Sequence, residues 1–174
     1  MNGAASPALP ATPSLRRRLA CFVYEGVLLF GVLMITALVY GLGTEQRHAL
    51  VGQSGLQVVL FLVLALYFVV FWSRGGQTLA MKTWHIRVLT AAGVPLSPLR
   101  ALLRYQLAWL WFLPALALAH GSGLRTGGAI AGTLLAGVLA YAGIARLMPQ
   151  RQFLHDIIAG TRLAHWQPAP RGRA

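Results

Sequence analysis

Acidic side chains are nearly absent from this 174-residue chain: three Asp and Glu residues stand against fifteen Lys and Arg, which gives a formal net charge of +12. Charged residues of both signs make up only 10% of the chain, whereas a soluble domain averages about 25%. Apolar residues make up 57%, more than a soluble domain of this length buries in one core. The composition therefore excludes an ordinary soluble protein and favours one that is embedded in a membrane.

Cysteine is limited to Cys21, which excludes an intramolecular disulfide and a metal cluster of thiolates. No Ser, Cys or Lys has an identifiable base and orienting partner, and no His or Cys stands at metal-binding spacing, so we expect no enzyme, no metal site and no cofactor. Most arginines lie beside the apolar runs rather than in one basic domain. This placement argues against nucleic-acid binding and predicts contact with anionic lipid headgroups.

Four apolar runs predict transmembrane helices, because crossing a bilayer takes roughly 20 apolar residues. The expected spans cover approximately residues 19–42, 55–72, 105–119 and 127–147. Pro114 predicts a kink in the third span, since proline removes a backbone donor. Ser97 and Pro98 are typical of a helix start, and an amphipathic helix over 99–104 then leads from the lipid headgroups into the third span.

Basic residues predict the orientation, because Lys and Arg mark cytoplasmic segments. Three arginines precede the first span, five basic residues lie in the loop 73–104 and five more lie at the very end of the fourth span or after it. The short loops 43–54 and 120–126 hold one each. Both termini and the loop 73–104 are therefore expected in the cytoplasm.

The loop 73–104 and the segment 150–160 predict a small cytoplasmic cap. Short strands are expected at residues 84–89, 94–96 and 161–166, with a turn at 91–93, and segment 150–160 is an amphipathic helix. The predicted fold is an all-α membrane protein: a four-transmembrane-helix bundle with a cap of short β-strands and interfacial amphipathic helices. The domain covers 15–166, and the tails 1–14 and 167–174 are predicted to be disordered.

One of the three acidic residues, Glu25, lies inside the first span, where a charge costs about 2.5–3.5 kcal/mol on insertion scales. Arg18 precedes it by seven residues on nearly the same helix face, about 10 Å along the axis. Asp156 is the only other acidic residue on the predicted cytoplasmic side. We therefore expect a polar cluster of Arg18, Glu25 and Asp156, either as a transport site or as a buried ionic staple. Candidates for supporting roles are Arg151, His155, Lys82 and Arg104.

Several separated motifs stand out along the chain. Residues 17–25 hold an Arg-Leu-Ala run that leads into a carboxylate, and residues 76–88 hold Gly-Gln-Thr-Leu followed by a basic residue and an Ile-Arg-Val strand. Residues 95–105 form a helix entry, and residues 155–161 read His-Asp-hydrophobic-hydrophobic-Ala-Gly-Thr. Together these motifs resemble the RDD family of small bacterial integral membrane proteins, whose last motif is matched in full and whose first aspartate is Glu25 here.

This resemblance implies a multi-pass protein of the bacterial inner membrane that transports a small solute or an ion, with sodium/proton antiport suggested for some members. Four thin spans leave little room for an enclosed path, so a homo-oligomer is expected. The alternative is a non-transporting accessory or scaffold protein whose cytoplasmic cap docks a partner. The near absence of polar groups from the second and fourth spans favours that alternative, because an ion path needs polar groups along its length.

Overall fold

The structure, a computed structural model, describes residues 10–44 and 53–166. The helices and strands are α1 (Leu15–Gly43), α2 (Gln53–Arg74), α3 (Leu79–Thr83), β1 (Ile86–Thr90), α4 (Pro98–Ala108), the 3-10 turn η1 (Trp109–Trp111), α5 (Leu113–Gly121), α6 (Gly127–Ile144), the 3-10 turn η2 (Pro149–Arg151), α7 (Leu154–Ile158) and β2 (Thr161–His165). The predicted fold class, an all-α membrane fold with four long apolar helical segments and a small sheet, is confirmed.

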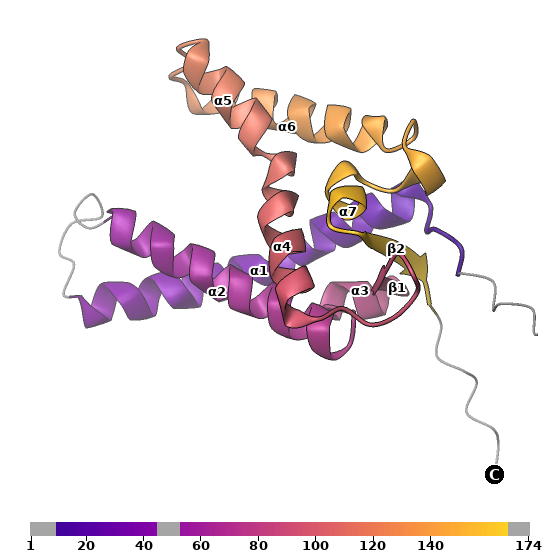
Figure 1. The fold of residues 1–174 in the computed structure, drawn as a ribbon. Coiled ribbons are helices and arrows are strands. Elements are labelled where there is room, and N and C mark those ends of the chain that lie inside the picture. The colour runs from indigo at the N-terminus through magenta and orange to yellow at the C-terminus, as the bar shows by residue number, and fades with distance from the viewer. Residues whose placement is uncertain (1–9, 45–52, 167–174) are drawn as a thin grey trace, which may run out of the picture.

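Two helical hairpins form the body of the molecule (Figure 1). In the first hairpin α1 packs beside α2, and in the second α5 packs beside α6. Helix α4 connects them: it packs against α2 and α7 and then passes through η1 into α5. The third apolar segment, Pro98–Gly121, is thus bent at η1, just before Pro114, which lies in the first turn of α5.

The long helices expose their apolar side chains instead of burying them. In the most apolar 18 residues of α1, of α2 and of α6, only 6% of the residues are buried inside the chain. Leu38, Leu62 and Leu139 are each more than half exposed. Apolar surface this extensive marks a membrane-facing protein, because soluble proteins rarely leave such patches uncovered.

Helix α4 exposes leucine side chains and buries one of its two arginines. Ser97 caps its N-terminus by accepting a hydrogen bond from the Arg100 backbone, as the sequence predicts. Leu99 and Leu103 face outward, 78% and 48% exposed, whereas Arg104 is buried. The second arginine of this helix therefore points into the protein.

A two-stranded antiparallel sheet forms the cap, with Ile86 of β1 opposite His165 of β2 and Thr90 opposite Thr161. The predicted return strand at 94–96 is wrong: the structure has no strand there. The Thr90 backbone donates to Val94 O and the Thr90 hydroxyl accepts from Val94 N, which closes a tight turn. β1 therefore pairs with the chain's distant C-terminal strand.

The chain segments before α1 and after α6 also meet at the cap (Figure 1). Ala11 O accepts from His165 N, and Thr12 accepts from the Gln152 amide, so the described part of the predicted tail 1–14 is held against β2. Residues 1–9 and 167–174 lie outside the described residues. Helix α6 ends at Ile144, three residues earlier than predicted, and the predicted helix 150–160 is reduced to α7 because Gln150 and Arg151 have positive φ.

Candidate functional site

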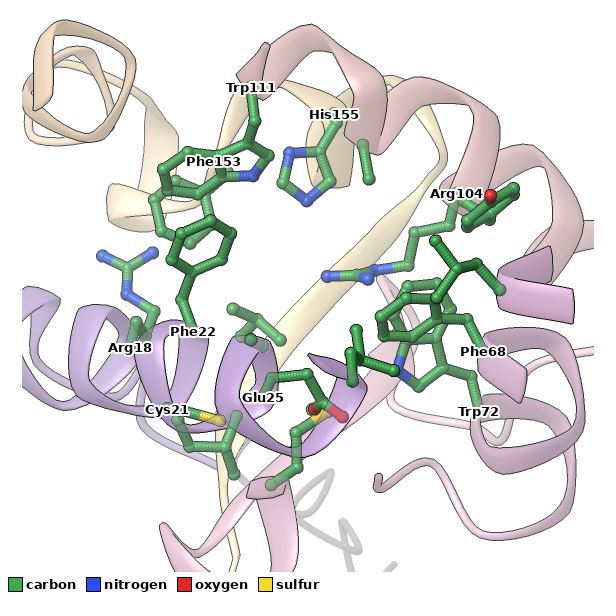
Figure 2. A pocket seen from close by; sticks show the side chains of 18 of the residues that line it. Arg18, Cys21, Phe22, Glu25, Phe68, Trp72, Arg104, Trp111, Phe153 and His155 are labelled. Atoms are coloured by element: carbon green, nitrogen blue, oxygen red, sulfur yellow. The ribbon is translucent and has the colours of Figure 1, made fainter. Parts of the chain in front are cut away.

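A cavity of about 370 Å³ lies between the α1–α2 hairpin, α4, η1 and the cap (Figure 2). Its lining is largely apolar and aromatic, and four of its side chains carry a carboxylate, guanidinium or imidazole group: Arg18, Glu25, Arg104 and His155. Pockets that bind small molecules commonly have volumes of roughly 300–1,000 Å³ and a few polar groups in an apolar lining. The cavity therefore has the size and character of a small-molecule site.

Glu25 lies ten residues into α1, about 15 Å along the helix axis from Leu15. It is 8% exposed, and both of its carboxylate oxygens accept hydrogen bonds from hydroxyl groups. Tyr67 of α2 donates to Oε1 at 2.7 Å, and Thr78 donates to Oε2. Within residues 10–44 and 53–166, no Lys, Arg or His forms an ion pair with Glu25. Hydroxyl groups, and not a cation, hold this carboxylate inside the span.

The local fold places Thr78 at Glu25. Thr78 caps α3 and accepts from the Met81 backbone with the same Oγ1 that donates to Glu25. Gly76, two residues earlier, has φ +68°, and a Cβ there would lie 2.7 Å from Val88 O. Gln77 donates to Ile86 O at 2.7 Å and ties this turn to β1. The Gly-Gln-Thr motif is therefore a turn that delivers one hydroxyl to the span.

Asp156 forms the second buried polar centre. Arg104 Nη2 of α4 lies 2.7 Å from Asp156 Oδ1, and the two side chains are 6% and 0% exposed. Thr161 donates to the Asp156 backbone carbonyl at 3.2 Å, and Gly160, with φ +63°, makes the turn between them. Burial alone raises the pKa of Asp156, but the charge and hydrogen bond of Arg104 and the charge of Arg18 together hold that pKa below its ordinary value. Asp156 is thus an anion paired with Arg104.

His155 lies beside this pair without carrying a charge at neutral pH. Tyr141 Oη of α6 lies 2.9 Å from His155 Nδ1 and accepts from the His155 backbone at 3.0 Å. Burial is the main cause that lowers the pKa of His155 to about 4; the carboxylate of Asp156 opposes the shift, and Arg104 adds to it. His155 therefore links α7 to α6 as a neutral side chain.

Arg18 is 5% exposed, and its guanidinium carbon lies 4.3 Å from the centre of the Phe153 ring. In the described part of the chain, no carboxylate lies within ion-pair distance of Arg18. Its Nε and Nη1 atoms are buried and have no hydrogen-bond partner in the part of the chain that the structure describes. Arg18 thus brings an unpaired buried positive charge to the cavity wall.

The structure brings some of the predicted site residues together and separates others. Arg18, Glu25, Arg104 and His155 all line the cavity, whereas Asp156 lies behind it, bound to Arg104. Arg18 and Glu25 do not touch, because seven helical residues keep them about 10 Å apart along the axis. Arg151 and Lys82 are exposed and lie outside the cavity lining. The ionic staple that the sequence suggested for α1 joins α4 to α7 instead.

Sequence reasoning missed the hydroxyl partners. Tyr67 and Tyr141 lie within spans that looked devoid of polar groups, yet their hydroxyls contact Glu25 and His155. The signal was present, since a buried tyrosine hydroxyl usually finds a hydrogen-bond partner. In the sequence, Thr78 stands out only as part of the motif at residues 76–88. Across the described residues, no group of three His, Cys, Asp or Glu side chains is arranged to hold a metal ion.

Comparison with known proteins gives one result for most of the chain: residues 12–160 match the RDD family. This region includes α1, the Gly-Gln-Thr turn, Arg104 and the His155-Asp156 pair. No curated protein and no solved structure matches the chain.

Proposed function

The chain belongs to the RDD family, and from this premise and the geometry of the cavity we propose that it transports a small solute across the bacterial inner membrane. The observation that carries the proposal is a 370 Å³ cavity that reaches from the cap to a carboxylate inside a membrane span. The cavity binds the solute, and Glu25 exchanges a proton or a cation during the cycle. The proposal assigns the protein no catalytic step and no cofactor.

The hydroxyl groups around Glu25 support proton exchange. As an anion, the carboxylate accepts from both Tyr67 and Thr78. When it is protonated, it must donate its own O–H to one of these oxygens, and that hydroxyl must release its hydrogen bond to Glu25. Tyr67 belongs to α2 and Thr78 caps α3, so a change of protonation rearranges the contacts of α1 with both elements. Protonation is thereby coupled to the packing of the cavity wall.

Sodium is the second candidate ion for exchange at Glu25. The two carboxylate oxygens of Glu25 lie beside the hydroxyl oxygens of Tyr67 and Thr78 that donate to them, and oxygen is the ligand that hard cations prefer. The rest of the cavity wall is apolar, so a sodium ion there has few further ligands. We therefore propose proton exchange as the main coupling and sodium/proton exchange as its variant.

The charge distribution supports a cytoplasmic cap with both termini on that side. Exposed basic residues lie at helix ends or in the short elements near the cap. Arg16 and Arg100 are in the first turns of α1 and α4, Arg74 ends α2, Lys82 is in α3 and Arg151 ends η2. The connection between α5 and α6, which points away from the cap, carries only Arg125 among its described residues. Cytoplasmic segments are rich in Lys and Arg. The basic rim of the cap is accordingly proposed to contact anionic lipid headgroups, and a homo-oligomer is proposed to complete the path.

A groove on the cap favours the second candidate function, an accessory protein that docks a partner. Gln77, Lys82, His85 and Trp166 line this surface groove beside the sheet. It is separate from the membrane cavity and faces the proposed cytoplasm. In this role the cavity is structural and the chain moves no solute.

Flux in proteoliposomes tests the transport proposal. Purified protein is reconstituted, and uptake of protons, of ²²Na⁺ and of 1-naphthoate, a small aromatic carboxylate, is followed under an imposed pH gradient. We expect flux for the native chain and loss of the proton-coupled component in Glu25→Gln. Tyr24→Phe is the matched control, because Tyr24 is the neighbour of Glu25 but 40% exposed. A folded native protein that moves none of these probes overturns transport and leaves the accessory role.

A further inference from the structure

Four buried nitrogen atoms that carry hydrogen lie around the cavity and have no hydrogen-bond partner among residues 10–44 and 53–166. They are Nε and Nη1 of Arg18, Nε1 of Trp72 and Nε of Arg104, and all three residues line the cavity. A buried donor without an acceptor costs about 1–3 kcal/mol, more when it is charged, so such groups are rare unless something completes them. The cavity wall therefore has an excess of donors.

The carboxylate acceptors of the cavity lining are already engaged. Both oxygens of Glu25 accept hydrogen bonds from hydroxyl groups, and Asp156 Oδ1 is bound to Arg104 behind the wall. The remaining acceptor, Asp156 Oδ2, is buried without a partner among the described residues, but Asp156 does not line the cavity. Arg104 also stacks over Trp72 at 4.2 Å, so its charge is shared between an anion and a ring. Arg18 differs from Arg104, because it has the Phe153 ring and no carboxylate. Figure 2 shows the Arg18 guanidinium beside Phe153, away from Glu25 and Arg104.

The rest of the cavity lining favours a ligand whose larger part is apolar. Aromatic side chains from four elements surround the space: Phe22, Phe68, Trp109, Trp111 and Phe112 are among them. Phe22 stacks on Trp111 with their ring centres 4.9 Å apart. Aromatic walls favour flat or hydrocarbon groups.

We propose that the cavity binds an amphipathic anion: one carboxylate or phosphate group on an apolar body. The anionic group accepts hydrogen bonds from Arg18, and the body lies among the aromatic side chains. This inference rests on the proposed function in taking the cavity as the solute site, and it names the substrate class. The same chemistry is found in a water-soluble aromatic acid and in a fatty acid or lipid of the bilayer.

Calorimetric titration of the native chain in phosphatidylcholine nanodiscs tests this proposal, with empty nanodiscs subtracted. The probes are 1-naphthoate, its neutral analogue 1-naphthylmethanol and its cationic analogue 1-naphthylmethylamine. We expect naphthoate to bind about tenfold or more tightly than either analogue, because a charge-assisted hydrogen bond is lost in both. Equal binding of the alcohol and the carboxylate overturns the proposal.

Arginine variants locate the anion. Arg18→Gln is expected to weaken naphthoate binding about tenfold or more, and Arg18→Lys less, since the charge remains but the planar fork is lost. Arg16→Gln is the matched control: it lies half a turn away on α1 and is exposed. Native affinity in a folded Arg18→Gln contradicts the assignment. Thermal unfolding of each variant checks its fold.

A variant that leaves Arg18 intact keeps the test decisive when Arg18→Gln does not fold. Ala108→Phe fills the cavity, which Ala108 lines, and is expected to abolish naphthoate binding. Ala117→Phe makes the same change on the exposed side of α5 and is expected to leave binding unchanged. Unchanged binding in a folded Ala108→Phe overturns the proposal, because the body of the ligand then lies elsewhere.

Competition distinguishes the two sources of the anion. If dodecanoate and nanodiscs containing phosphatidylglycerol displace naphthoate, the site takes its anion from the membrane; if they do not, it takes a water-soluble acid. Either result supports an amphipathic anion. Naphthoate binding without any flux in proteoliposomes keeps this inference and removes transport. Proton or sodium flux with no naphthoate binding removes this inference and keeps transport.

Discussion

The two buried carboxylates are stabilised by different chemistry. Asp156 is fully buried and bound to the guanidinium of Arg104, whereas Glu25 has two hydroxyl donors and no ion pair with a described residue. Neutralising one member of a buried ion pair leaves the charge of its partner buried and uncompensated. A carboxylate held by hydroxyls has partners that can reverse their hydrogen bonds when it gains a proton. The difference supports the proposal that Asp156 has a structural role and that Glu25 exchanges a proton.

Breaking the Arg104–Asp156 pair is expected to have the largest effect on stability. Asp156→Asn leaves Arg104, 5% exposed, without an anion, and removal of one partner of a buried pair costs about 3–5 kcal/mol. The free energy of unfolding is measured in mixed micelles by SDS titration. Arg100→Gln, an exposed residue one turn earlier on α4, is the control with little expected change. A loss under about 1 kcal/mol, typical of an exposed pair, contradicts the staple.

Lowering the pH is expected to destabilise the folded chain through protonation of His155, which lies beside the Arg104–Asp156 pair. Its pKa is 6.5 in the unfolded chain and about 4 in the folded one. Between these pH values the unfolded chain binds a proton at His155 and the folded chain does not. The free energy of unfolding therefore falls as the pH drops from 6.5 to 4, by about 3 kcal/mol in total. Below pH 3.8 Asp156 adds to the loss, because folding lowers its pKa.

Unfolding measured across this pH range checks the role of His155. His155→Gln is expected to be less stable at pH 7 and to lose most of the slope between pH 6.5 and 4. His120→Gln, at an exposed site on α5, keeps the native slope. An undiminished slope in His155→Gln assigns the acid sensitivity to another group.

The turn that delivers Thr78 to Glu25 gives the next largest expected effect. Gly76→Ala places a side chain at φ +68° with its Cβ 2.7 Å from Val88 O, and we expect a loss of about 2 kcal/mol from the strain and the clash with backbone. Gly75→Ala is the adjacent control, because the nearest atom to its Cβ lies 3.9 Å away. Its change is expected within about 0.5 kcal/mol. Equal stability of the two variants contradicts this account of the turn.

The helices and the polar residues follow from the sequence, but their pairing does not. Long apolar runs and the Ser97-Pro98 start are local signals, and they locate α1, α2, α4 and α6. Glu25 and Asp156 stand out because few acidic residues exist. Which cation meets Asp156 depends on the direction of α4, and Arg18, Arg104 and Arg151 are equivalent candidates in the sequence alone.

Long-range contacts account for what sequence reasoning missed. Tyr67 and Thr78 are 42 and 53 residues from Glu25, and no local pattern links them to it. β1 likewise pairs with β2, some 70 residues along the chain, although residues 94–96 offer a nearer strand-like sequence. The turn at Thr90 and Val94 decides this choice, and its hydrogen bonds appear only in three dimensions.

The smallest expected change in the free energy of unfolding is for Glu25→Gln. Comparing it with Asp156→Asn is the most direct test of the difference between the two carboxylates. Glu25→Gln keeps an oxygen that accepts one hydroxyl, and its amide donates to the other, so we expect a loss of about 1 kcal/mol or less. Glu25→Leu is the matched control: it leaves the fully buried Thr78 hydroxyl without its acceptor and is expected to cost about 1–3 kcal/mol. Both are measured by the SDS titration used for Asp156→Asn. If Glu25→Gln destabilises the chain as much as Asp156→Asn, Glu25 is a second staple, and its charge is needed for folding rather than for proton exchange.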